Sequence, residues 1–232
     1  MIRTSAVTVL AVAGLAVTGV IGASAASASP AVPAFQFTTR LDAVMVKPDQ
    51  VAEITGADVM SVVGSATELA DTSDGLDPAE CISAFEPGQR AAYEGSGWVD
   101  VNTKVLADGG PGRATHFANQ TIVVFDDAEA SRAYIATASD SWSRCAGQTV
   151  TFARDSGQVD EWVLGEAELR PNDVMVMSQT AGSATCERAI TGYDEFVLDA
   201  MTCDFRGGDP AGQAEQIAAA LSAQAAVVDH QR

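Results

Sequence analysis

TIVVFDDAEASRAYIATASDSWSRCA, residues 121–146, is the stretch that decides the fold. It begins with an apolar run at residues 122–125, typical of a buried strand, which two aspartates interrupt. Asp126 with Glu129 three residues later predicts a helix start, because a capping carboxylate accepts hydrogen bonds from first-turn amides. One helical face then carries Ala130, Tyr134, Ala138, Trp142 and Cys145. The stretch therefore predicts a strand that leads into a helix ending in a cysteine, at the centre of a small α+β domain.

Further strands are expected on both sides of this centre. The alternation at residues 98–106 predicts a half-buried strand with Val101 inward and Asn102 on a polar face. We also expect strands at residues 60–69, 115–125, 148–154, 158–164 and 173–179, and a hairpin at residues 185–204. Helices are expected to begin at Pro48, at Pro78 and at the Asp209–Pro210 cap. This order predicts one mostly antiparallel sheet with helices packed on one side.

The first 28 residues are expected to be a cleaved signal peptide. Arg3 precedes an apolar stretch, and residues 23–25 and 26–28 both fit the small-x-small cleavage pattern, with cleavage after Ala28 favoured. An uncleaved anchor is the alternative, since the stretch is nearly long enough to span a bilayer. Residues 29–40 are expected to be a flexible leader or an added edge segment, and residues 41–230 one domain. We expect no lipoprotein cysteine and no transmembrane segment in the mature chain.

The charge of the chain limits its partners. The sequence has 31 acidic and 13 basic residues, for a net charge of −18. Binding to nucleic acid or an electrostatic hold on anionic lipid needs basic patches, so both are disfavoured. The acidity is explained either by solubility on an extracytoplasmic surface or by a site for a cationic ligand or metal.

Four cysteines in an exported protein imply two disulfides. Three pairings are open, but Cys186 and Cys203 flank the predicted hairpin. A turn centred on Asp194–Glu195 would place those two cysteines opposite each other, within reach of a disulfide. That leaves Cys81 with Cys145. Zinc binding is disfavoured, because no C-x-x-C spacing occurs.

The sequence offers little catalytic chemistry. His116 and His230 are its two histidines, and it contains no G-x-S-x-G, H-E-x-x-H or P-loop motif. A pair of carboxylates could support a hydrolase, but with 31 acidic residues such a pair carries no information. We therefore expect no enzyme, no cofactor and no metal site, with a carboxylate-dependent hydrolase as a minor alternative.

Three side chains stand out as polar or amphipathic groups in unusual places. Gln120 shares a strand face with apolar residues, which makes it either a satisfied core amide or a residue that points into a pocket. Arg188 lies diagonal to Asp199 in the predicted hairpin, where an exposed ion pair is the simple explanation. Trp98 follows a Gly-Ser-Gly turn and could line a groove or cover the sheet.

Several short motifs occur in a fixed order: a cysteine followed by YEGSGW at residues 93–98, QTIVVF at 120–125, WSRC at 142–145, CERA at 186–189 and a last cysteine before a terminal helix. This ordered set resembles the PknH-like extracellular sensor domain of actinobacterial envelope proteins. The resemblance covers about residues 41–228. It implies a twisted antiparallel sheet with flanking helices, a V-shaped cleft that binds a ligand, and the disulfides Cys81–Cys145 and Cys186–Cys203.

The resemblance leads to a functional hypothesis. We expect a secreted, non-enzymatic ligand-binding or sensor-like module of the cell envelope. Its partner would be a small molecule or lipid in the cleft, or else an envelope protein if the role is structural. The residues expected to contact a ligand are Tyr93, Trp98, Gln120 and Arg188, which lie in or beside the recurring motifs.

Overall fold

The computed structural model describes residues 40–110, 112–154 and 156–229. The expected signal peptide, His230 and the leader, apart from Arg40, lie outside these residues. Within the described part, no helix has both the length and the apolar character that crossing a bilayer requires.

The central strand and helix form as predicted. Strand β4 (His116–Val124) leads into α5 (Ala128–Cys145), whose inner face buries Tyr134 and Trp142. The helix cap is Asp127, and not Asp126 as predicted. The Asp127 carboxylate accepts hydrogen bonds from the backbone N–H groups of Glu129 and Ala130, both at 2.9 Å. Asp127 has the extended backbone that a cap needs, which explains the one-residue shift.

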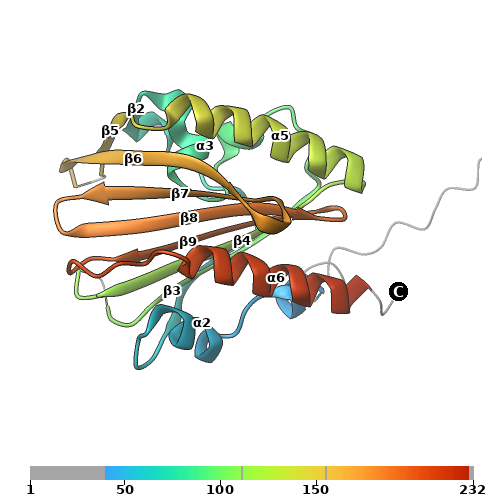
Figure 1. Cartoon of the computed structure of the whole chain (residues 1–232), viewed down its shortest axis with the longest axis horizontal. Coiled ribbons are helices and arrows are strands. Elements are labelled where there is room, and N and C mark those ends of the chain that lie inside the picture. The colour runs from blue at the N-terminus through green and yellow to red at the C-terminus, as the bar shows by residue number, and fades with distance from the viewer. Residues whose placement is uncertain (1–39, 111, 155, 230–232) are drawn as a thin grey trace, which may run out of the picture. The chain divides into compact units, whose positions relative to one another are not determined.

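The described strands form a single antiparallel sheet of nine, in the order β1-β3-β4-β9-β8-β7-β6-β5-β2 (Figure 1). Neighbouring strands are mostly consecutive in the chain, so the sheet is largely a meander. The short strands β1 and β2 form its two edges. The bounds are β1 Ser61–Ala66, β2 Leu76–Asp77, β3 Asp100–Ala107, β5 Thr149–Ala153, β6 Val159–Arg170, β7 Val174–Ala181, β8 Ala184–Tyr193 and β9 Phe196–Asp204.

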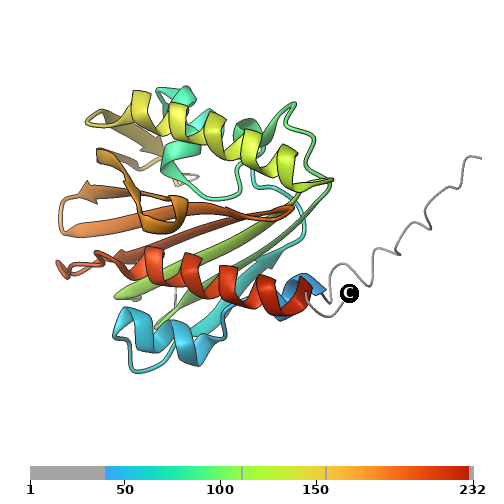
Figure 2. The same cartoon turned by 45° about the vertical axis from the view of Figure 1, so that its right-hand side comes forward.

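Helices cover both faces of the sheet, whereas the sequence predicted helices on one side (Figures 1 and 2). One core contains Trp142 of α5 and Val123, and the other contains Leu221 of α6 and Ile122. Because successive strand residues point to opposite faces, the apolar run at residues 122–125 supplies both cores. The remaining helices are α2 Pro48–Thr55, α3 Ile82–Phe85, α4 Arg90–Tyr93 and α6 Gln213–Asp229, with 3₁₀ turns η1 Ser73–Gly75, η2 Ala79–Cys81 and η3 Pro171–Asp173.

The second helical layer also covers a face predicted to be polar and exposed. Residues 40–44 are helical and pack there. The Asn102 side chain, only 4% exposed, donates a hydrogen bond to Asp42 at 3.1 Å, and Lys104 pairs with Asp42 at 2.7 Å. Alternation correctly assigned Val101 and Asn102 to opposite faces, but it could not show that a distant segment covers the second face.

Helix α6 begins at Gln213, later than the predicted Asp209–Pro210 cap. Its first-turn amides bond to Glu187 of β8, which accepts from the backbone N–H of Gly212 at 2.7 Å and of Ala214 at 2.8 Å. Burial raises the pKa of the Glu187 carboxyl, and these backbone hydrogen bonds lower it in part. A carboxylate at this position also interacts favourably with the helix dipole. A strand residue therefore caps a helix that is distant in sequence.

The predicted hairpin is present. Strands β8 and β9 are joined through Asp194 and Glu195, and Cys186 pairs directly with Cys203. The structure contains the disulfides Cys186–Cys203 and Cys81–Cys145, which close 17- and 64-residue separations. By loop-closure entropy these are worth about 3 and 4 kcal/mol. The longer one fixes the segment before α3 to the end of α5.

Candidate functional site

A concave cleft lies beside α5 on the same face of the sheet. Its volume is ≈ 540 Å³. Helix α5 packs over the other half of this face, and the segment that precedes β3 forms a wall beside it. The cleft is therefore bounded by the sheet below and by residues 68–72 and 85–89 on one side.

The register of the sheet builds the floor of the cleft. Gln179 pairs with Cys186, Cys186 with Cys203, and Cys203 with Phe117, so these side chains form one row across four strands. The disulfide lies within that row. The next row on the same face contributes Met201, Asn119, Val105 and Gly64. Because the floor consists of paired strands, it is a rigid surface.

Aromatic side chains line two sides of the cleft. Phe85 contacts Phe152 and Trp162, with ring centroids 5.5 and 5.9 Å apart. Phe117 and Phe205 form a second pair at 6.3 Å, and Phe205 is 37% exposed. Phe117 lies on β4, whereas Phe152 and Trp162 lie on β5 and β6, and the Cys186–Cys203 disulfide of β8 and β9 lies between them in the sheet.

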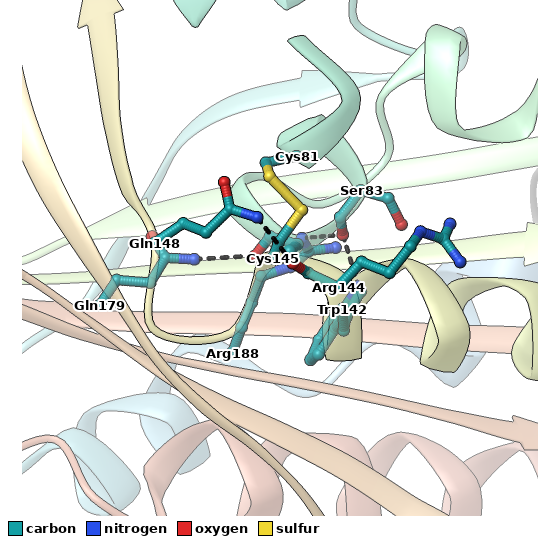
Figure 3. Close-up of a disulfide and its surroundings, with 9 residues drawn as sticks. Cys81, Ser83, Trp142, Arg144, Cys145, Gln148, Gln179 and Arg188 are labelled. Carbon is teal, nitrogen blue, oxygen red and sulfur yellow. Dashed lines mark hydrogen bonds between the residues drawn. A yellow bond between two sulfur atoms is a disulfide. The ribbon is translucent and has the colours of Figure 1, made fainter. Parts of the chain in front are cut away.

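Buried polar side chains hold the backbone of residues 83–85, which leads into the wall (Figure 3). Gln179 donates to the carbonyls of Ala84 at 3.0 Å and Phe85 at 2.9 Å. The Ser83 carbonyl accepts from Trp142 Nε1 at 2.7 Å and from Arg188 Nη1 at 2.5 Å. Three consecutive carbonyls are thus fixed by side chains of the sheet and of α5.

Arg188 forms a buried ion pair, and not the exposed pair that was expected. Its guanidinium lies 2.6 Å from the Asp199 carboxylate, and the two side chains are 2% and 1% exposed. It also lies 4.8 Å from the ring centroid of Trp142. Burial raises the pKa of the Asp199 carboxyl, while Arg188 and a hydrogen bond from the Gly88 backbone oppose that rise. Arg188 therefore lies behind the cleft wall, bonded to Asp199 and to the Ser83 carbonyl.

The other residues expected to contact a ligand are also placed outside the cleft. Gln120 is fully buried on the opposite face, where its amide exchanges two 2.8 Å hydrogen bonds with the backbone of Val46. Tyr93 is 1% exposed and stacks on Tyr134 at 4.1 Å, and burial raises its pKa. Trp98 is partly buried against the same core as Tyr93. Among the described residues that line the cleft, none of the four expected contacts occurs.

Sequence reasoning missed Gln179, although a signal was present. It lies on a strand face with Met175 and Met177, the same pattern that drew attention to Gln120. Its Oε1 has no hydrogen-bond partner among the described residues and exposes almost no surface. The aromatic walls had no comparable signal, because Phe85, Phe117, Phe152, Trp162 and Phe205 lie far apart in sequence.

The rim of the cleft carries more acid than base. Glu86 accepts hydrogen bonds from Thr72 Oγ1 at 2.8 Å and Gln89 Nε2 at 3.0 Å, and Glu68 is exposed nearby. The one cation on the rim in the described chain, Arg154, pairs with Asp160 and holds the pKa of that carboxyl low.

A cluster of titratable side chains around His116 lies away from the cleft. His116 lies on the α6 face, 2.7 Å from Asp108 and 3.6 Å from Asp204. In the part of the chain that is described, no group of three His, Cys, Asp or Glu side chains is placed to hold a metal ion. The described lining of the cleft is thus mainly apolar, with a few polar groups.

Comparison with known proteins identifies a matching family model and similar proteins. A family model described as the PknH-like extracellular domain matches residues 38–224. The serine/threonine-protein kinases PknH of Mycobacterium tuberculosis and Mycobacterium bovis are each 26% identical over 176 residues, or 75% of this chain. The match spans only 28% and 29% of those kinases.

A solved structure agrees with the fold. The crystal structure of the extracellular domain of PknH from Mycobacterium tuberculosis superposes with a TM-score of 0.74 at 25% identity. The superposition covers 82% of this chain and 96% of that domain. The sheet, its helices and the two disulfides are therefore those of an extracellular domain.

Proposed function

Because the chain belongs to the PknH-like extracellular domain family, we propose that it is a secreted, non-enzymatic, sensor-like module that binds a small molecule or lipid in its cleft. The observation that carries this proposal is the cleft itself. Its volume of ≈ 540 Å³ lies within the range of about 300–1,000 Å³ that ligand pockets occupy. Aromatic walls and few polar groups are the usual lining of such sites.

The rigidity of the cleft supports binding. The bonds from Gln179, Trp142 and Arg188 hold the backbone of residues 83–85, which leads into the wall. The Cys81–Cys145 disulfide anchors the residues just before them. A site formed before the ligand arrives loses little conformational entropy on binding. We therefore expect ligand to bind without a large rearrangement of the domain.

Native mass spectrometry of the mature protein from its own culture medium tests this function. We expect additional mass that is lost on denaturation, and less of it in Phe205→Ser, which removes an exposed ring from the cleft. The denatured mass also tests cleavage after Ala28 and the two disulfides. Wild-type protein that stays bare, even after incubation with envelope lipid extract, contradicts the proposal.

A second candidate function is binding to an envelope protein through the sheet edge. Strand β1 is an edge strand, and Val62 and Val63 are 47% and 57% exposed. Exposed apolar edge strands can pair with a strand of a partner. If this is the function, Val63→Lys reduces capture of an envelope protein in a pull-down and Phe205→Ser does not.

A further inference from the structure

The geometry of the cleft limits the shape of its ligand. Phe117 lies on β4 and Trp162 on β6, four strand spacings apart in the sheet. At about 4.8 Å per spacing, the backbone positions of Phe117 and Trp162 are separated by roughly 19 Å along the sheet. A ligand that contacts both walls is therefore elongated, and it lies across the Cys186–Cys203 disulfide.

Charge limits the ligand further. Glu68 and Glu86 are at the rim, and the charge of Arg154 is compensated by Asp160. The chain as a whole carries a net charge of −18. The described residues of the floor offer no cation to an anionic group, since its two rows consist of amides, a disulfide, a phenyl ring and apolar residues. Bringing an anion to an apolar, acid-rimmed site costs desolvation and repulsion together.

From these observations we propose, on the basis of the function proposed above, that the cleft selects elongated apolar molecules without negative charge and discriminates against fatty-acid-like anions of the same size. The apolar body lies between the Phe85–Trp162 wall and the Phe117–Phe205 wall. A neutral or cationic polar end lies at the rim near Glu68.

Matched probes test this selectivity on the purified, disulfide-intact protein. N-phenyl-1-naphthylamine and 8-anilino-1-naphthalenesulfonate share their rings and N–H group and differ by one sulfonate. We expect the neutral dye to bind at least about tenfold more tightly. Displacement of that dye by 1-alkanols should strengthen about fourfold per methylene until the chain reaches both walls. Alkanoates of equal length should displace it far more weakly.

Variants locate the binding and the charge effect. Phe205→Ser should weaken neutral-dye binding, whereas Leu169→Ser, which removes a 66% exposed side chain away from the cleft, should not. Glu68→Lys should lower the ratio of neutral-dye affinity to anionic-dye affinity at least about threefold. The control Glu53→Lys makes the same charge change on α2, on the opposite face of the sheet, and should leave this ratio unchanged.

The outcomes separate the two proposals. Equal binding of neutral and anionic probes, still sensitive to Phe205→Ser, overturns the selectivity and leaves the cleft as a ligand site. Binding that Phe205→Ser and Leu169→Ser affect equally overturns the proposed function as well.

Discussion

Removal of Arg188 should cost the protein stability and leave its ligand selectivity intact. In Arg188→Met, the Asp199 carboxylate stays 1% exposed but loses the guanidinium 2.6 Å away. Leaving one buried charge without its partner typically costs about 3–5 kcal/mol. For a chain of this size that corresponds to a fall in Tm of roughly 6–20 °C. The Ser83 carbonyl also loses one of its two donors.

Urea unfolding with the disulfides intact, followed by tryptophan fluorescence, measures this cost. The control Arg170→Met breaks an exposed pair with Glu168 and should change the unfolding free energy by about 1 kcal/mol or less. The double variant Arg188→Met/Asp199→Leu carries no buried charge at this position and should recover much of the loss.

The reasoning is refuted if Arg188→Met is no more costly than Arg170→Met, or if the double variant is less stable than the single one. A further readout separates a structural role from ligand contact. At temperatures where Arg188→Met is folded, its affinity for N-phenyl-1-naphthylamine should fall only slightly, because Trp142 Nε1 still bonds the Ser83 carbonyl. Loss of binding with unchanged stability would instead support the sequence-based hypothesis that Arg188 contacts the ligand.

Three further predictions concern the caps and the second face of the sheet. Asp127→Ala should cost about 1 kcal/mol in thermal unfolding, because two first-turn amides of α5 lose their acceptor. Gln120→Leu leaves the backbone N–H and carbonyl of Val46 buried without a partner. It should cost at least about 2 kcal/mol and should speed hydrogen exchange of the Val46 amide, measured by NMR. The third change is Glu187→Gln. Since the folded-state pKa of Glu187 is raised above its ordinary value of 4.5, the native state binds the proton more readily than the unfolded state. The stability of wild type relative to this variant should therefore fall as pH rises from about 4.5 through the folded-state pKa, in urea titrations at a series of pH values. If the difference in unfolding free energy between wild type and Glu187→Gln stays constant or increases over this pH range, the pKa of Glu187 is not raised in the folded state.

Local sequence patterns predicted the elements whose determinants are close in the chain. The helical period from Tyr134 to Cys145 indicated α5, and the spacing of Cys186 and Cys203 about a two-residue turn indicated the β8–β9 hairpin. In both cases the contacts that matter are fixed by periodicity or by strand register.

Apart from the Cys81–Cys145 disulfide, contacts between distant segments were the part that could not be predicted. The Glu187 cap of α6 depends on the path of the loop before Gln213, and no local signal describes that path. The face of the sheet on which each helix packs likewise depends on contacts with strands that are distant in sequence. The candidate site was predicted as a cleft only through the family resemblance. Its lining residues were not predicted, because residues as distant in sequence as Phe85 and Phe205 come to line the same cleft only in the folded chain.

The manner in which the wall is held affects how the domain can diversify. Gln179, Trp142 and Arg188 donate hydrogen bonds to the backbone carbonyls of residues 83–85. Every amino acid has such a carbonyl, whatever its side chain. The wall's own side chains take no part in these bonds. Replacing Phe85 with another apolar residue therefore reshapes the cleft while the anchoring bonds persist. The shape of the cleft can in this way change by point mutation without rebuilding of the scaffold around it.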